Sequence, residues 1–375
     1  MINKLISKGF TLASFVLLFA CTPEYEALDN AVYFGEAQNV NSKNVTVKAE
    51  GAQTNLYLSL AARSGNKVEA EIAVDAKVLE DFNKRNGTNY LLLPESYYNL
   101  STNQCVIEAG KLSSSLVDIN INAFDDNLEV SEKYAIPVKI ASANGANILE
   151  ASSNMVVLCD KIITTKVLFA SGGNTSSSTT LDLGAETVCN STTWTVEFLT
   201  NSKSFSLNRH ILSIKDAATG KVEVFGRFGE YDHPFDEIQF KVTNIPFYGL
   251  NRFEPNRWYH VALTCDGTTV RLYQDGKLDF AADSSEPNRT YSWNNFTLRC
   301  GNPGALSEFR IWNVARTQAE ITNNMYAVNP DSEGLEIYWK INEGKGNVAY
   351  DYSGNGRDIP LMRGTWKEQT FPPEY

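Results

Sequence analysis

Histidine, closely spaced cysteines and excess positive charge are all scarce or missing in this chain. Three histidines occur in 375 residues (His210, His233 and His260), which leaves little room for a histidine metal cluster. No two cysteines stand in a CxxC spacing, so a zinc site of that type is not indicated. Lys and Arg number 33 against 44 Asp and Glu. The resulting net charge of −11 argues against nucleic acid as a partner, because phosphate binding needs clustered cations.

The sequence also lacks long apolar runs, and its most apolar stretch is a short one near the start. Phe10 to Phe19 follow two lysines, as in a secretory signal peptide, and the run is too short to span a bilayer, which takes ~20 residues. Leu18-Phe19-Ala20-Cys21 is typical of a lipoprotein processing site. We therefore predict a signal peptide over residues 1–20, lipidation of Cys21 and a tether over residues 21–29. An ordinary secretion signal with an incidental cysteine is the alternative.

The acidic residues just after Cys21 bear on where in the cell the protein is located. Thr22-Pro23-Glu24-Tyr25-Glu26 resembles the export signal of surface lipoproteins of Bacteroidetes-type bacteria. The resemblance implies a protein anchored to the outer membrane by lipid and exposed on the cell surface.

Five further cysteines leave the thiol chemistry open. Their odd number cannot pair completely within one chain. Cys265 and Cys300 each end a strand-like run, so a disulfide between them is one prediction, and export would permit it. Buried free thiols are the other.

The hydrophobic pattern predicts an all-β protein of two domains. Apolar and polar residues alternate over short runs separated by Gly, Asn, Asp and Ser, which is typical of sandwiches and barrels. Helical signal is limited to Ala76–Asn86 and to Gln318–Met325. The clearest predicted strands are Asn55–Ala61, Val68–Val74, Val117–Ile121, Val222–Phe228 and Glu237–Val242.

We place the domain boundary between residues 162 and 163, just ahead of a Gly/Ser/Thr-rich loop at 171–180. The first domain, residues 30–162, resembles a small β-sandwich of unknown function at the N-terminus of many Bacteroidetes lipoproteins. The resemblance implies a spacer or interaction module. Ile136-Pro137 indicates an edge or strand-start position there, because proline lacks a backbone donor. The matching residues are Ala31-Val32-Tyr33-Phe34, Thr88-Asn89-Tyr90, Leu93-Pro94, Val106 to Gly110 and Tyr134 to Val138.

The second domain, residues 163–375, carries sharper motifs. Trp258 to Thr264 is followed by Asp266-Gly267, and a return strand by Asp275-Gly276, which are strong hairpin signals. Leu306 to Thr317 and then Tyr338 to Gly344 follow in order. Together they resemble the laminin-G-like, concanavalin-A-like jelly roll. The resemblance implies two antiparallel sheets packed face to face, an architecture common in lectins.

Because this fold hosts both lectins and glycosidases, catalysis needs its own evidence. A glycosidase needs two carboxylates at a set separation. The nearest match to an ExDxxE pattern is Glu230-x-Asp232, but Phe235 occupies the third position and Pro234 would break a central strand. We predict a loop there and no enzyme.

The sequence assigns no metal ligands. Asp351-x-Ser353-x-Asn355-Gly356 resembles the start of an EF-hand loop, but its twelfth position is Met362. We interpret it as a structural turn. Calcium is left open, because many laminin-G-like domains carry it.

The candidate ligand residues are aromatic and polar residues of three predicted loops. Trp194, Trp258, Trp312 and Trp339 lie on predicted strands and are assigned to the core. Trp293 lies in a polar segment and is predicted to stack on a sugar, because sugars bind through an apolar ring face and hydrogen-bonded hydroxyls. The predicted binding residues are Trp293, Tyr291, Tyr231, Tyr248, His233 and Asn294.

The combination of anchor, spacer and jelly roll resembles proteins that hold glycans near an outer-membrane transporter and partner glycosidases. We therefore expect a glycan-binding protein of a carbohydrate-uptake system. The alternatives are an adhesion or structural lipoprotein that binds another protein and, third, a glycosidase.

Overall fold

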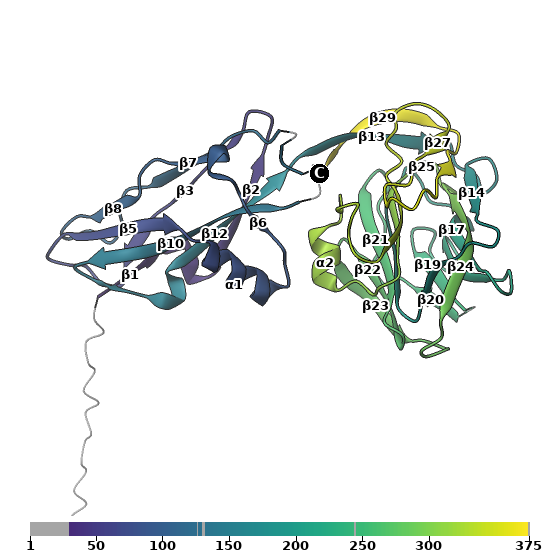
Figure 1. Ribbon diagram of the computed structural model, residues 1–375, viewed down its shortest axis with the longest axis horizontal. Helices are drawn as coiled ribbons and strands as arrows, with labels where there is room; N and C mark the ends of the chain where they lie inside the picture. The colour runs from purple at the N-terminus through teal and green to yellow at the C-terminus, as the bar shows by residue number, and fades with distance from the viewer. Residues whose placement is uncertain (1–29, 126, 130–131, 244, 374–375) are drawn as a thin grey trace, which may run out of the picture.

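The computed structural model describes residues 30–125, 127–129, 132–243 and 245–373 and forms two β-rich domains (Figure 1). The predicted signal peptide and Cys21 lie outside the described residues. The sheets built from residues 31–161 share no strand with those built from residues 163–371. The all-β prediction is confirmed. No helix of the described residues has the length and apolar character needed to cross a membrane.

The first domain is a sandwich of short strands with one helix. Its largest sheet runs in the order β2-β12-β10-β5-β8, with β6 beside β10, and smaller sheets run β11-β1-β4 and β3-β9-β7. The elements are β1 (Ala31–Phe34), β2 (Ser42–Val47), β3 (Ala52–Leu56), β4 (Leu58–Leu60), β5 (Val68–Val74), α1 (Ala76–Asn86), β6 (Leu91–Leu92), β7 (Tyr98–Leu100), β8 (Gln104–Ile107), β9 (Val117–Ile121), β10 (Tyr134–Asn144), β11 (Asn147–Ile148) and β12 (Asn154–Lys161).

Strand β10 has apolar residues on both faces because both faces are covered. Ile136 and Val138 pack into the sandwich core, whereas Ala135 packs under α1. The helix begins after Asp75, whose carboxylate accepts a hydrogen bond from the Lys77 backbone at 2.8 Å. The edge position predicted for Pro137 is wrong. Pro137 lies within β10, where the neighbouring strand changes from β6 to β5 and no donor is needed.

The second domain is a jelly roll of two sheets packed face to face. We call the sheet that carries α2 the near sheet, because it lies toward the first domain, and the other the far sheet (Figure 1). The near sheet runs β23-β22-β21-β16-β25-β13-β29, with β26 beside β25. The far sheet runs β14-β24-β17-β18-β19-β20, with β15 beside β24, and β27 pairs with β28 separately.

The elements of the second domain span residues 163–371. They are β13 (Ile163–Ala170), β14 (Ser178–Asp182), β15 (Val188–Ser191), β16 (Trp194–Ser202), β17 (Arg209–Asp216), β18 (Val222–Phe228), β19 (Ile238–Val242), β20 (Ile245–Tyr248), β21 (Trp258–Cys265), β22 (Thr269–Gln274), β23 (Lys277–Asp283), β24 (Tyr291–Arg299), β25 (Gly304–Trp312), α2 (Gln318–Asn323), β26 (Leu335–Trp339), β27 (Val348–Ala349), β28 (Ile359–Pro360) and β29 (Thr365–Phe371).

Aromatic side chains fill the space between the two sheets. Phe309 stacks on Phe198 and on Trp339, with ring centroids 6.3 Å and 5.3 Å apart. The four tryptophans assigned to the core from sequence, Trp194, Trp258, Trp312 and Trp339, are all buried, so that prediction is confirmed. All five described cysteines are buried free thiols, and the predicted Cys265–Cys300 disulfide is wrong.

Candidate functional site

The far sheet presents a row of hydrogen-bonded side chains on the face that points away from the core. Arg227 on β18 lies opposite Gln239 on β19, which in turn lies opposite Tyr248 on β20. The Nε–H of Arg227 donates to Gln239 Oε1 at 2.8 Å, and the side-chain amide of Gln239 donates to the Tyr248 hydroxyl at 2.7 Å. Core residues occupy the alternating positions on these strands, so the three side chains are held in fixed directions.

Further polar groups hold the Arg227 end of this row. Arg227 forms an ion pair with Glu230, and its NH1 donates to Asn208 Oδ1 at 2.9 Å. His210 Nε2 lies 3.1 Å from the same oxygen, and its ring meets Phe225 edge-on at 4.9 Å. Burial lowers the pKa of Arg227. Burial also lowers the pKa of His210, and the positive charges of Arg299 and Arg227 lower it further. His210 is therefore predominantly neutral at pH 7.

The turn between β18 and β19 supplies flat aromatic surfaces beside the same row. The His233 ring stacks parallel on Tyr248, with centroids 3.9 Å apart and 3° between planes, and His233 Nδ1 lies 2.7 Å from Glu237 Oε1. Tyr231 is 74% exposed and Phe235 51%. Aromatic faces next to directed hydrogen-bonding groups are the combination that a sugar ring requires. We call Arg227, Gln239, Tyr248, His233 and Tyr231 the far-sheet site.

Two of the six predicted binding residues, His233 and Tyr248, stack on each other in the far-sheet site, and a third, Tyr231, lies in the same turn as His233. Tyr248 was predicted to lie in a loop, but Ile245–Tyr248 form the edge strand β20. That strand places Tyr248 in register with Gln239, a contact that sequence spacing alone does not show.

The prediction that Trp293 and Tyr291 are exposed in a loop is wrong. Both lie on β24 and are buried, with relative exposures of 0% and 1%. Trp293 meets Trp194 edge-on at 5.3 Å between ring centroids, in the core between the two sheets. A sugar cannot stack on either ring without unfolding this end of the core.

Asn294 is also separated from the far-sheet site. It lies on β24, where its side-chain amide donates to the Gly184 carbonyl at 2.7 Å. Strands β17, β18 and β19 stand between β24 and β20. At ~4.8 Å per strand spacing, Asn294 and Tyr248 lie roughly 19 Å apart across the sheet. One small ligand cannot bridge that distance.

Sequence reasoning missed Arg227, Gln239 and Asn208. For Arg227 and Gln239 the available signal was strand alternation: Val224, Phe228 and Phe240 are core positions, so the residues between them face outward. The predicted loop at Glu230 and Asp232 is confirmed as the connection between β18 and β19. Glu230 is engaged by Arg227, and Asp232 has a φ of 65°, a turn conformation.

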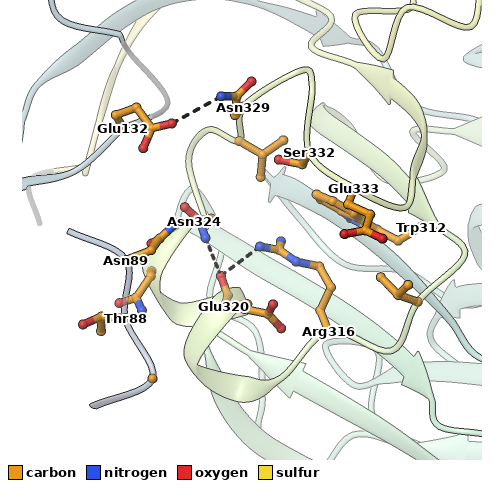
Figure 2. Close-up of a pocket in the computed structure, with 14 residues that line it drawn as sticks. Thr88, Asn89, Glu132, Trp312, Arg316, Glu320, Asn324, Asn329, Ser332 and Glu333 are labelled. Carbon is orange, nitrogen blue, oxygen red and sulfur yellow. Dashed lines mark hydrogen bonds between the residues drawn. The ribbon is translucent and has the colours of Figure 1, made fainter. Parts of the chain in front are cut away.

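A hollow lies between the two domains (Figure 2). It encloses about 440 Å³ and is lined by polar groups such as Asn89 and Glu132 from the first domain and Arg316 and Glu320 from the second. Asn329 donates to Glu132 across the gap at 3.3 Å. The tryptophan in its wall, Trp312, is only 3% exposed, so this pocket offers little aromatic face for stacking.

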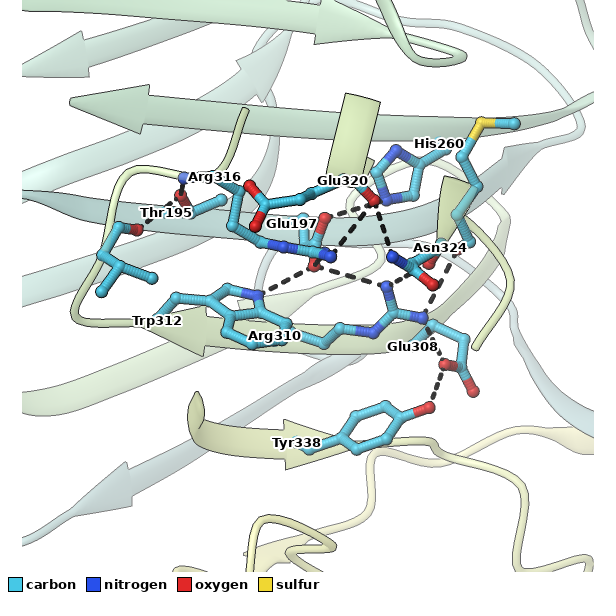
Figure 3. A network of polar contacts seen from close by, with 12 residues as sticks. Thr195, Glu197, His260, Glu308, Arg310, Trp312, Arg316, Glu320, Asn324 and Tyr338 are labelled. Carbon is cyan, nitrogen blue, oxygen red and sulfur yellow. Dashed lines mark hydrogen bonds and ion pairs between the residues drawn. The ribbon is translucent and has the colours of Figure 1, made fainter. Parts of the chain in front are cut away.

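Beneath that pocket, the outward face of the near sheet carries a buried ionic cluster (Figure 3). Glu197 Oε1 lies 2.7 Å from Arg316 and 3.4 Å from Arg310, and Arg310 reaches Glu308 at 2.6 Å. Trp312 Nε1–H donates to Glu197 at 2.8 Å. Burial alone would raise the pKa of Glu197, but Arg316 and Arg310 outweigh it and hold that pKa well below its usual range. The negative charges of the two carboxylates balance the positive charges of the two guanidiniums, so we regard the cluster as structural.

The described residues contain no group of three or more His, Cys, Asp or Glu side chains placed to hold a metal ion. The turn at Asp351 is occupied by protein donors. Its Oδ1 accepts the backbone N–H groups of Tyr338 and Ser353, and its Oδ2 accepts that of Arg357, all at 3.0 Å. These bonds fit the structural turn expected from sequence.

Comparisons with known proteins agree with this architecture. A family model described as the concanavalin A-like lectin/glucanases superfamily, Laminin_G_3, matches residues 173–322, so the chain contains a laminin-G-like, concanavalin-A-like domain. A second model, described as an N-terminal domain, matches residues 28–147. No curated protein matches the chain.

Among solved structures, a Bacteroides ovatus protein named as a candidate carbohydrate-binding protein is 23% identical, with a TM-score of 0.56, over 92% of this chain and 98% of that one. EndoBT-3987 of Bacteroides thetaiotamicron, solved with a Man5GlcNAc product, is 24% identical over 35% of this chain and 30% of that one, with a TM-score of 0.30. A pentraxin of Limulus polyphemus is 12% identical over 55% and 91%, with a TM-score of 0.35. The first likeness shows a shared fold along nearly the whole chain.

Proposed function

We propose that this protein is a non-catalytic, glycan-binding lipoprotein of the cell surface, and that the far-sheet site holds the sugar. The observation that carries the proposal is the stacked His233–Tyr248 pair, joined by hydrogen bonds to Gln239 and Arg227 and flanked by the exposed Tyr231. The pair is preorganised, so little side-chain freedom is lost when a ligand binds.

The fold and its relatives support this proposal. The Bacteroides ovatus protein that shares the two-domain fold is named for carbohydrate binding. The predicted signal peptide and Cys21 would tether the protein to the outer membrane, and the first domain would hold the jelly roll away from that tether. In this arrangement the protein would deliver oligosaccharides to a transporter or to partner glycosidases of an uptake system.

Absence of catalysis is part of the proposal. At the far-sheet site, Glu230 is held by Arg227 and Glu237 lies against His233, so both glutamates near the aromatic surface already have a partner. A glycosidase needs one acid free to donate a proton and a second carboxylate facing it. Neither acid is placed for that work.

A glycan array probed with the chain from residue 22 onward tests the binding role. We expect specific oligosaccharides to bind without being shortened. Tyr231→Ala and Tyr248→Ala should each weaken binding about tenfold, equivalent to ~1.4 kcal/mol, because each removes one stacking face. Tyr350→Ala is the matched control, since Tyr350 is also exposed, at 55%, but lies outside the far sheet.

The outcomes separate the alternatives. Product release from a bound glycan would restore the glycosidase interpretation. If no glycan on the array is bound and another surface protein is captured specifically, the result would favour the adhesion or structural lipoprotein. Normal binding by both tyrosine variants would move the site elsewhere.

The anchor is tested separately in the native cell. Cys21→Ala should abolish labelling by a fatty-acid analogue and release the protein from the membrane fraction. A variant that still labels and stays membrane-bound would contradict lipidation at Cys21.

A further inference from the structure

The outward face of the far sheet carries four cationic side chains in one neighbourhood. Lys215, Arg227, Lys241 and Arg299 lie on β17, β18, β19 and β24. Each follows a residue that faces the core or closely approaches it: Ile214, Gly226, Phe240 and Leu298. Strand alternation therefore turns all four toward solvent.

Only one of these four cations has a carboxylate partner among the described residues. Arg227 pairs with Glu230. Arg299 donates to the Asn174 carbonyl at 3.1 Å and lies 3.4 Å from Ser213 Oγ, both uncharged groups. Arg252, Arg271, Arg289 and Arg357 of the same domain, in contrast, each pair with a carboxylate. An arginine that is partly buried without an anion is unusual in a chain with net charge −11.

Three carboxylates near this face are already engaged. Glu230 is held by Arg227, and Glu237 lies against His233. Asp182, at the β14 edge, accepts hydrogen bonds from Asn295 and from the Gly184 backbone. On strands β17, β18, β19 and β24, Asp216 and Glu223 pair with Arg289, so the charges of this face that keep no ion-pair partner among the described residues are cationic.

An aromatic ring lies among these cations. Phe225 on β18 is opposite Ser213 on one side and Lys241 on the other. The Arg227 guanidinium carbon lies 5.8 Å from its ring centroid, and His210 meets it edge-on. His210 also lies within electrostatic reach of both Arg299 and Arg227, since both lower its pKa. Phe225 thus offers a partly exposed apolar face with positive charge around it.

We propose that the far-sheet face selects glycans that carry carboxylates or sulfates, with a sugar ring on Phe225 and the anionic groups of the glycan on Arg299 and Lys241, which lie on either side of that ring. This inference rests on the proposed glycan-binding function and names its ligand class. Guanidinium and ammonium groups bind such anions by charge-assisted hydrogen bonds, and Arg can bind a carboxylate with two parallel bonds.

Calorimetric titration of the chain from residue 22 onward tests the proposal with three probes of equal length. The probes are trigalacturonic acid, a sulfated trisaccharide of the same backbone as the neutral probe, and neutral galactotriose. We expect at least one acidic probe to bind ten times more tightly than the neutral one, and its advantage to shrink at 0.5 M salt. Whichever acidic probe binds more tightly identifies carboxylate or sulfate as the natural group.

Two variants locate the anion. Arg299→Gln and Lys241→Gln should each weaken the acidic probe five- to tenfold and leave the neutral probe unchanged. Lys241 is only partly buried and lies on the outward face of β19, so Lys241→Gln still tests the proposal if Arg299→Gln folds poorly. Lys166→Gln, on β13 of the near sheet, is the matched control and should change neither.

The His210 resonance gives an independent readout. A bound anion stabilises the imidazolium, so the acidic probe should raise the pKa of His210 and the neutral probe should not. Equal binding of neutral and acidic probes, with both variants unaffected, would overturn the charge selection and leave glycan binding standing. If no glycan binds at all, the proposed function fails together with this inference.

Discussion

The two sheets of the jelly roll put charged side chains on their outward faces by the same strand alternation, yet the charges differ in their surroundings. On the near sheet, Glu197 and Arg310 are fully buried beneath α2 and the segment after it, and each is paired with a side chain of opposite charge. On the far sheet, Lys241 and Arg299 keep part of their surface in water and have no carboxylate partner among the described residues. The cover over a sheet therefore decides whether its outward charges stabilise the fold or remain available to a ligand.

The largest expected effect is at the covered cluster. Glu197→Gln removes the shared anion of Arg310 and Arg316 and should cost ~3–5 kcal/mol of unfolding free energy, measured by urea denaturation at pH 7. Glu186→Gln is the control, because Glu186 pairs with Arg357 at the surface with 55% of its side chain exposed, and it should cost under ~1 kcal/mol. Equal losses would mean that the cover does not strengthen the cluster.

Trp293→Ala tests the assignment of that ring to the core. Removing a fully buried indole should cost ~3–5 kcal/mol, read as a drop in melting temperature, because a cavity is left beside Trp194. Trp366→Ala, at a partly buried ring on the same core, should cost less. Weakened glycan binding with unchanged melting temperature would restore the binding role expected from sequence.

The dependence of stability on pH in the acid range tests the buried cluster of the near sheet further. The pKa of Glu197 in the folded state lies below its unfolded value, so its stabilising contribution is complete above the unfolded pKa, ~4.3. That contribution is lost as the pH falls below this value toward the folded pKa. Stability of the wild type should therefore decline more steeply than that of Glu197→Gln below about pH 4. Parallel profiles in urea titrations at several pH values would contradict this.

The smallest expected effect is at Asn294. Asn294→Ala deletes one half-exposed hydrogen bond to the Gly184 carbonyl and should cost ~0.5–1.5 kcal/mol. Glycan affinity should stay unchanged, because three strands separate β24 from β20. A tenfold loss of affinity would place the ligand across the whole sheet.

Sequence predicted regular elements better than it predicted the site. Ala76–Asn86, Val68–Val74, Val117–Ile121 and Val222–Phe228 have the predicted bounds, because their hydrophobic periods are uninterrupted. Trp293 was misplaced because the register of β24 against β17 shifts there: Lys215 pairs with Asn295, and Asp216 with Trp293. Asn294 is the extra residue, and it hides the alternation within a polar segment.

The far-sheet site was only partly predictable for a related reason. Tyr231, His233 and Tyr248 stand in aromatic-rich segments and were found by composition. Arg227 and Gln239 are twelve residues apart and meet only through the pairing of β18 with β19. Contacts that depend on register require the strand bounds before any side chain can be placed.

The single residue between β12 and β13 has a mechanical consequence. Strand β12 is paired on both sides, with β2 and β10, and β13 is paired with β29 from Ile163 to Phe169. A force that pulls the two domains apart would load these pairings along the strand direction, where many hydrogen bonds must break together. The junction should therefore resist extension better than a flexible hinge would, and a load on the jelly roll would pass to the first domain with little stretching between them.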